Sequence, residues 1–140
     1  MNNFMDYAII EAQKAETEIP VGAVIVYKNE IISAAHNLKE TLNDPTAHAE
    51  ILAIRKAAEA RASWRLDECC MYVTLEPCPM CAWAIREARI KRLYFGAYDK
   101  NYGAAGSFMN LLNSIEVYGG ILEDNCTKLL VDFFKNKRGN

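Results

Sequence analysis

Apolar residues recur along the chain with two different periods, and these predict most of the secondary structure. Helical spacing predicts a first helix over residues 4–16. The continuous β-branched run over 21–27 is typical of a strand buried on both faces, and residues 31–35 predict its hairpin partner. Asp44 and Pro45 match the N-cap and first position of a helix, which we expect over 46–62.

Strands and helices alternate in the second half of the chain. The pattern predicts strands over 70–75, 92–97 and 115–118. It also predicts a helix that begins between Pro77 and Pro79 and ends at 89, and two further helices over 108–112 and 123–137. A strand–helix–strand order requires a parallel pair with a right-handed crossover. We therefore expect an α/β fold with three α/β/α layers and a mixed five-stranded sheet.

Length and charge narrow the class of protein. A chain of 140 residues predicts one domain over residues 1–140, and a hydrophobic content of 51% is too high for a disordered chain. We expect no membrane span, because no apolar run approaches roughly 18 residues. We expect no secretory leader, because the first residues have neither a basic start nor an apolar stretch. The net charge of -2 disfavours a protein that coats nucleic acid by bulk charge. The acidic excess lies in residues 1–50, however, and residues 51–100 are basic overall.

The cysteines indicate a reducing compartment. Their number is odd and two are adjacent, which is a poor framework for disulfides, so we expect a cytoplasmic protein. Three of them are expected to act as small buried apolar residues. They are Cys69, Cys70 and Cys126.

The other two cysteines, Cys78 and Cys81, form a CxxC pair, which on its own is compatible with a redox pair or a metal site. His48, in the first turn of another predicted helix, adds a third ligand, and this set suits Zn²⁺. Both cysteines lie at a helix N-terminus, whose dipole favours the thiolate. Cys69 and Cys70 are expected roughly 20 Å away, so the ion should keep an open coordination position.

Glu50 is the candidate general base. An open zinc position beside a carboxylate is the arrangement that makes hydroxide at neutral pH. A glutamate in a first helical turn is also favoured there by the helix dipole alone. Residues i and i+2 of a regular helix do not face each other, so His48 and Glu50 can reach one ion only if the first turn is irregular.

Two short motifs together resemble the H-x-E…P-C-x-x-C signature of zinc nucleoside and nucleobase deaminases. They are His48-Ala49-Glu50 and Pro77-Cys78-Pro79-Met80-Cys81. Neighbouring segments are similar to a narrower family, the bacterial tRNA-specific adenosine deaminases of the cytidine/deoxycytidylate deaminase superfamily. These segments are residues 21–24, 44–51, 72–81 and 103–107. The similarity extends over about residues 4–138 and implies a cytidine deaminase-like fold.

The resemblance implies hydrolytic conversion of the wobble adenosine of a tRNA anticodon to inosine. His48, Cys78 and Cys81 would hold one Zn²⁺ per chain. Glu50 would take a proton from the zinc-bound water that attacks C6 of adenine, and then deliver protons to the ring nitrogen and the leaving ammonia.

The resemblance also implies substrate contacts and partners. Asn37 and the backbone N–H of Ala47 would contact the base, and Asp99 would lie near the RNA backbone, where a carboxylate could accept a 2′-OH hydrogen bond. Asn37 could equally be a turn former, and Asp99 a solvated loop residue. The expected partners are a tRNA anticodon loop and a second copy of the chain in a homodimer, with no DNA substrate.

Three features depart from the family's pattern. Trp83 stands where the family often has glycine, and we expect it to fill the core or an interface. Tyr98 and Asn101 occupy positions that are often basic in the family, which weakens the case for phosphate contacts there. The segment between Leu112 and Ile115 is short.

Other functions stay open at this point. A deaminase of free guanine, cytosine or adenosine would carry the same zinc motif. A non-catalytic, zinc-stabilised interaction module would need a fourth protein ligand and would not depend on Glu50. A redox protein would be free of metal and would form a reversible disulfide between Cys78 and Cys81.

Overall fold

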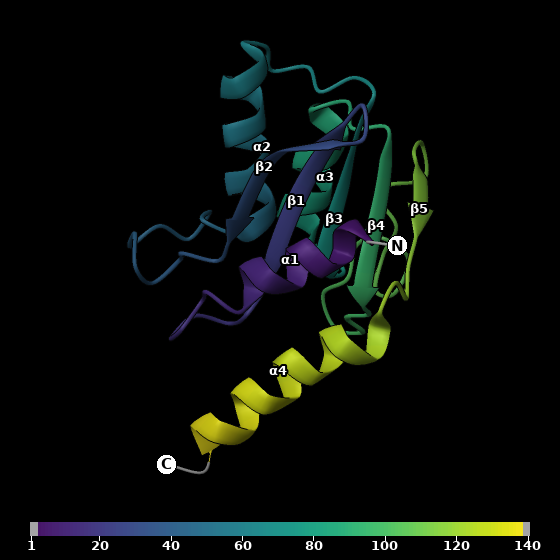
Figure 1. Ribbon diagram of the computed structural model, residues 1–140. Coiled ribbons are helices and arrows are strands. Elements are labelled where there is room, and N and C mark those ends of the chain that lie inside the picture. Colours follow the sequence, from purple (N-terminus) through teal and green to yellow (C-terminus); the bar gives the residue numbers. More distant parts are fainter. Residues whose placement is uncertain (1–2, 139–140) are drawn as a thin grey trace.

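The computed structural model describes residues 3–138 and has a central five-stranded sheet with helices on both faces (Figure 1). In their order across the sheet, the strands are β2 (Glu30–His36), β1 (Gly22–Tyr27), β3 (Cys69–Leu75), β4 (Arg92–Ala97) and β5 (Glu116–Tyr118). Strand β1 is antiparallel to both of its neighbours, whereas β3, β4 and β5 run parallel. The predicted α/β class and mixed sheet are confirmed.

The helices form the outer layers. They are α1 (Phe4–Ala12), α2 (Ala49–Arg61), α3 (Pro79–Glu87) and α4 (Glu123–Arg138). Helices α2 and α3 cover one face of the sheet, and α1 and the first part of α4 cover the other (Figure 1). Strand β1 is buried along nearly its whole length because both of its faces are covered, as its apolar sequence predicts.

Helix α1 crosses the sheet closely at Gly22, the first residue of β1. A Cβ atom at this position would overlap the carbonyl oxygen of Ala8 and approach the amide nitrogen of Ala12. The Gly22 N–H donates to the Thr74 hydroxyl of β3 at 3.1 Å. The absence of a side chain at Gly22 therefore sets the distance between α1 and the sheet.

Two predicted helix boundaries and one predicted helix were wrong. Helix α1 ends at Ala12 instead of residue 16. Helix α2 begins at Ala49 instead of residue 46, because the Asp44 carboxylate accepts hydrogen bonds from the N–H and hydroxyl of Thr46 and closes a separate turn before the helix. The helix predicted over 108–112 is absent, because this segment folds back through an isolated bridge between Ala105 and Asn110.

The structure narrows one expectation about a single side chain and corrects another. Trp83 lies outside the core of the chain, because it is 48% exposed and its indole ring lies 4.8 Å under the Arg86 guanidinium, so its place at an interface stays a prediction. Cys69 and Cys126 are buried as expected, but Cys70 is only partly buried. No helix within residues 3–138 has the length and apolar character needed to cross a membrane.

Candidate active site

The chemically important residues gather at the carboxyl ends of β3 and β4 and at the start of α2. Ligand sites of open α/β sheets usually lie at this edge. Cys78 follows β3, Asp99 follows β4, and His48 precedes α2. Residues far apart in the sequence therefore meet in one place.

His48 is the N-cap of α2 and has an extended backbone, with φ -77° and ψ 153°. Its imidazole makes no capping hydrogen bond. The ring points instead toward the cysteines, with Nδ1 3.6 Å from the Cys78 Sγ and 3.4 Å from the Cys81 Sγ. The non-helical conformation of His48 removes the difficulty that residues i and i+2 of a regular helix face different ways.

Helix α3 supplies the two thiols from its first turn. Cys78 is the N-cap, Pro79 takes the first helical position, and Cys81 follows one turn further along. The ligand atoms of His48, Cys78 and Cys81 lie within 4.8 Å of one another. In a tetrahedral zinc site, bonds of about 2.3 Å to sulfur and about 2.0 Å to nitrogen place these atoms about 3.5 Å apart. The measured N–S separations therefore fit a zinc ion.

Hydrogen bonds among His48, Cys78 and Cys81 determine which of these side chains carry a charge. A hydrogen bond from Cys81 lowers the pKa of Cys78 to about 4, against the effect of burial, and His48 also favours the thiolate. The same hydrogen bond raises the pKa of Cys81. The pKa of His48 is raised by its hydrogen bond to Cys78. Since both thiols must be deprotonated as ligands, binding of the metal releases a proton from this group.

Glu50 follows His48 by two residues, in the first turn of α2, and is only 4% exposed. Burial raises its pKa to about 7, and the negative charge of Cys78 acts in the same direction. A carboxyl group with a pKa near neutrality is suited to take up and release protons at physiological pH. Glu50 therefore has the burial and position that a general base requires.

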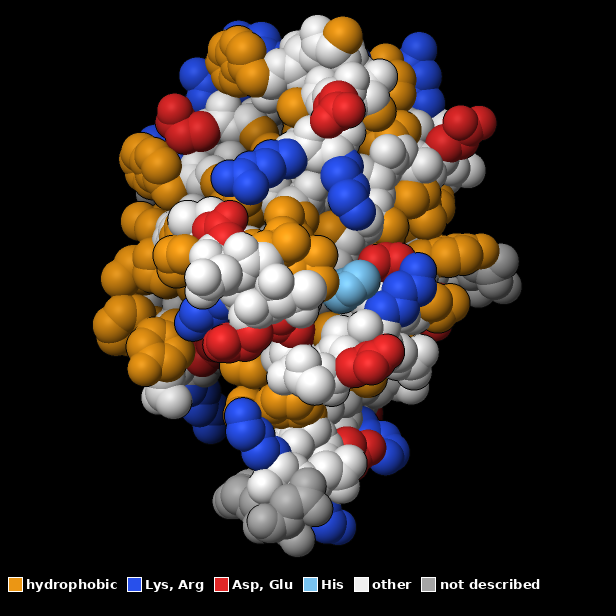
Figure 2. Space-filling view, turned by 90° about the vertical axis from the view of Figure 1, so that its left-hand side faces the viewer, with side chains coloured by type: hydrophobic (Ala, Val, Ile, Leu, Met, Phe, Trp, Pro, Cys, Tyr) orange, Lys and Arg blue, Asp and Glu red, His pale blue; other side chains and the backbone are white. Residues whose placement is uncertain are grey.

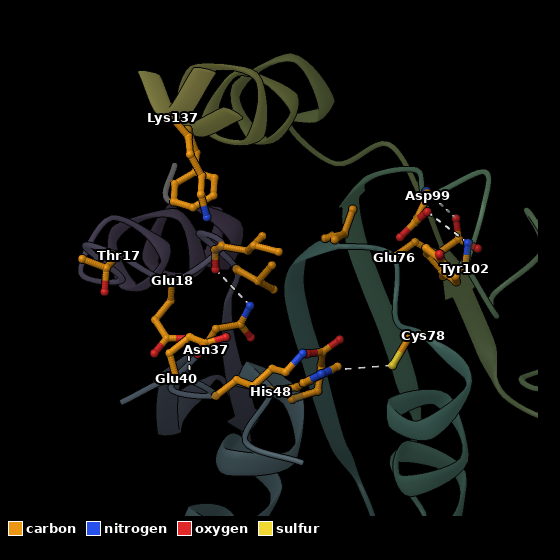
Figure 3. A pocket seen from close by; sticks show the side chains of 16 residues that line it. Thr17, Glu18, Asn37, Glu40, His48, Glu76, Cys78, Asp99, Tyr102 and Lys137 are labelled. Atoms are coloured by element: carbon orange, nitrogen blue, oxygen red, sulfur yellow. Dashed lines mark hydrogen bonds between the residues drawn. The ribbon is translucent and has the colours of Figure 1, made fainter. Parts of the chain in front are cut away.

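These side chains open into a pocket of about 620 Å³, a volume that suits a small ligand. Acidic and basic side chains are interspersed on one face of the molecule (Figure 2). Inside the pocket, Figure 3 shows Glu18 and Asn37 on one wall, Asp99 and Tyr102 on the opposite wall, and His48 between them. Helix α4 reaches the mouth of the pocket.

The three residues predicted to bind substrate have different surroundings. Asn37 lines the pocket, and its side chain accepts a hydrogen bond from the Ala49 N–H at 2.8 Å and donates to the Ile19 carbonyl at 2.9 Å. Ala47 is buried, and its N–H donates to the carbonyl of the turn residue Asp44. Their contacts with a base stay predictions.

Asp99 also lines the pocket. One of its carboxylate oxygens accepts hydrogen bonds from the N–H groups of Asn101 and Tyr102, both at 3.1 Å. The second oxygen has no hydrogen bond among the described residues. Asp99 is therefore more than a solvated loop residue, and its contact with a 2′-OH stays a prediction.

Two buried carboxylates that line the pocket were not predicted from the sequence, and they are Glu18 and Glu76. Glu18 accepts hydrogen bonds from the N–H groups of Glu40 and Thr41, at 3.1 and 2.7 Å, and from the Thr41 hydroxyl. A signal for Glu76 existed in the sequence, because it is a charged residue between a buried strand and the Pro77–Cys78 motif. For Glu18 we find no such signal.

Comparison with known proteins identifies the family. A sequence model described as the cytidine and deoxycytidylate deaminase zinc-binding region matches residues 1–97. The chain belongs to this deaminase family. Together with the geometry of His48, Cys78 and Cys81, this membership establishes zinc as the cofactor of the deaminase.

Within the family, the deaminase is similar to tRNA-specific adenosine deaminases. That of Bacillus subtilis (strain 168) is 47% identical, and the match covers 96% of this chain and 89% of the relative. That of Agrobacterium fabrum is 44% identical, with coverage of 97% and 95%. A structure from a study of A-to-I editing by tRNA:A34 deaminases has a TM-score of 0.86 and 44% identity, and covers 91% of this chain and 98% of that one. The resemblance inferred from the motifs is confirmed.

Proposed function

We propose that this deaminase hydrolyses adenosine to inosine at the wobble position of a tRNA anticodon. The observation that carries the proposal is the buried Glu50 beside the His48–Cys78–Cys81 set, on a pocket large enough for one nucleoside. The similarity to tRNA-specific adenosine deaminases over nearly the whole chain supports an RNA substrate. We place this chemistry in one domain that comprises residues 1–140.

The protein's own groups have distinct parts in the proposed reaction. When bound by His48, Cys78 and Cys81, zinc supplies a Lewis acid that activates water near neutral pH. The Glu50 carboxylate accepts the two protons of the attacking water in turn, and delivers one to the ring nitrogen of adenine and one to the leaving amino group. Water replaces the C6 amino group, so that adenosine and water become inosine and ammonia.

The reactive adenine must leave the stack of neighbouring bases before it can enter the pocket. An anticodon loop already presents its bases largely unpaired, which lowers the cost of extrusion compared with a duplex. We propose that the second amide hydrogen of Asn37 and the backbone near Ala47 contact the purine. The Asp99 oxygen that has no hydrogen bond among the described residues would accept one from a ribose 2′-OH, a group that DNA lacks.

We further propose a homodimer in the cytoplasm. Large apolar side chains are exposed around α3 and the segment after β4, and a second copy of the chain would cover them. They include Met80, Trp83, Tyr98, Phe108 and Met109. Free cysteines are compatible with a reducing compartment. Analytical ultracentrifugation of the zinc-loaded protein tests the dimer, and a monomer at micromolar concentration would contradict it.

The function is tested with an RNA anticodon stem-loop that carries adenosine at the wobble position. We expect the zinc-loaded protein to form inosine, and Glu50→Gln to slow this by about a thousandfold while one zinc per chain is retained. Glu59→Gln, an exposed glutamate of the same helix, is the matched control and should remain active. Deamination of free guanine, cytosine or adenosine without turnover of the RNA would contradict the proposal.

A further inference from the structure

Glu76 is a buried carboxylate that the proposed chemistry leaves without a role. It follows β3 directly and is 2% exposed. Its two oxygens accept hydrogen bonds from the N–H groups of Asp99, Ala105 and Ser107, at 3.1, 3.0 and 3.0 Å, and a short one from the Ser107 hydroxyl. All four donors belong to one segment, residues 99–107.

This arrangement ties the conformation of the 99–107 segment to Glu76. A buried carboxylate is costly unless it is hydrogen-bonded, and no lysine or arginine among the described residues forms an ion pair with Glu76. The segment must therefore keep the one conformation that directs its N–H groups toward the carboxylate. Gly103 makes this close approach feasible, because a Cβ atom there would overlap the Glu76 carboxyl group.

The segment held in this way forms one wall of the pocket. Asp99 and Tyr102 line the pocket, and the Tyr102 N–H donates to the Asp99 carboxylate. The Tyr102 residue is 66% exposed. Figure 3 shows Glu76 beside Asp99 and Tyr102, on the opposite side of the pocket from Glu18.

We infer that Glu76 is a positioning residue for the RNA substrate. By fixing the 99–107 segment, it presents a carboxylate oxygen of Asp99 and the ring of Tyr102 to the nucleotides beside the reactive adenosine. A carboxylate accepts a hydrogen bond from a ribose hydroxyl, and an exposed aromatic ring stacks on an unpaired base. This inference rests on the proposed function.

The composition of residues 98–107 also favours stacking of an unpaired base on a tyrosine ring. Lys100 is the one basic residue of the 99–107 segment, so this wall has little positive charge to offer to phosphate. Two exposed tyrosines, Tyr98 and Tyr102, offer aromatic surface instead. Tyr98 packs edge-on against Phe95, with ring centroids 5.0 Å apart, so Tyr102 is the freer of the two rings.

The test is the kinetics of Glu76→Gln on the anticodon stem-loop. The amide has the same shape as the carboxylate, but it sets an N–H group against the donors of the segment. We expect the KM to rise about tenfold while kcat at saturating RNA stays within about twofold, because Glu50 lies on α2 and the hydrogen bonds of Glu76 go to residues 99–107 and not to the zinc ligands. Zinc content should remain one per chain.

A double-mutant cycle separates positioning from a general loss of structure. If Glu76 acts by positioning the 99–107 segment and its Tyr102 ring, then Glu76→Gln should raise the KM less than about threefold in a variant that already carries Tyr102→Ala. Glu18→Gln, which loosens the opposite wall, is the matched control. Its effect on KM should be the same with and without Tyr102→Ala.

The results that would overturn the proposed function differ from those that would overturn the positioning role of Glu76. If the wild-type protein makes no inosine in the stem-loop, the proposed function fails. If the wild-type protein is active, then an unchanged KM in Glu76→Gln, full additivity with Tyr102→Ala, or loss of zinc overturns the positioning role. Should Glu76→Gln fail to fold, Ser107→Ala removes only one donor and should raise the KM about threefold; an unchanged KM in this variant would also overturn the inference.

Discussion

At the start of α2, a side chain from another part of the chain replaces the usual helix cap. His48 stands at the N-cap position but makes no capping hydrogen bond, because its ring is directed at the cysteines. The buried Ala49 N–H, which a helix start leaves without a partner inside the helix, donates instead to the Asn37 side chain. Asn37 therefore stabilises the helix that carries Glu50, whatever contact it makes with substrate.

We expect Asn37→Ala to lower the free energy of unfolding by about 1–2 kcal/mol, because the Ala49 N–H loses its partner and the link to Ile19 is broken. Asn37→Asp keeps the acceptor and should recover part of the loss. Urea unfolding of the zinc-loaded variants measures both. Equal stability of Asn37→Ala and the wild-type protein would show that the cap is unimportant.

Glu18 predicts a pH dependence of stability. Burial alone would raise its pKa, but three hydrogen bonds from Glu40 and Thr41 bring the pKa below the ordinary 4.5. A lowered pKa means that the folded state binds a proton less readily than the unfolded state. The stability that Glu18 contributes is therefore complete above pH 4.5 and is lost as the pH falls through the lower pKa of the folded state.

The measurement compares Glu18→Gln with the wild-type protein by urea unfolding at several pH values. The wild-type advantage in unfolding free energy should be greatest near neutral pH and should shrink below pH 4.5. An advantage that does not change with pH would mean that the charge of Glu18 contributes nothing.

At the scale of elements, the contact between α1 and β1 depends on Gly22. We expect Gly22→Ala to destabilise the protein by about 3 kcal/mol, because the added methyl group would overlap the backbone of α1. Gly22→Ser should be at least as damaging. Thermal unfolding measures the effect, and an unchanged melting temperature would mean that α1 moves away at little cost.

The secondary structure was largely predictable from the sequence because its signals are local. The five strands and the order of the helices follow from apolar runs and their periods. The start of α2 was misplaced because Asp44 and Pro45 satisfy the rules for a helix N-terminus and equally those for an isolated turn. Only the tertiary position of His48 decides between the two. The same holds for residues 108–112, which fold back through an isolated bridge instead of forming a helix.

The candidate site was predictable only where its chemistry lies in short motifs. His48, Cys78 and Cys81 could be recognised by type and spacing. The hydrogen bonds of the buried Glu18 and Glu76 could not be predicted, because their donors lie 22 to 31 residues away in the sequence. A glutamate is ordinarily expected at the surface, and only the folded chain shows what its partners are.

At the scale of the whole molecule, the distribution of charge limits how the protein holds RNA. Acidic and basic side chains alternate on the face in Figure 2 without a continuous basic stripe. Several basic side chains already form ion pairs with carboxylates, and they are Lys14, Arg65, Lys91, Arg92 and Lys128. Lys39 and Lys137 line the pocket.

We therefore expect few phosphate contacts and a weak dependence of RNA binding on salt. With two contacts to single-stranded RNA, a plot of log KM against log salt concentration should have a slope of about 1.5. The kinetics of inosine formation in the stem-loop over a range of KCl concentrations measure it. A slope of about 6 or more would indicate extensive binding along the RNA backbone.

The two walls of the pocket have a consequence for how this enzyme can be altered. The zinc ligands and Glu50 are built into the starts of two helices, whereas the walls are loops, each anchored by a single buried glutamate. In the proposed function, the reacting groups and the loops that form the pocket walls thus belong to different elements, although Asn37 links the two by capping α2. Redesign or natural divergence can exchange a wall together with its anchoring contacts and so change which nucleotides are accepted, while the deamination chemistry is inherited intact.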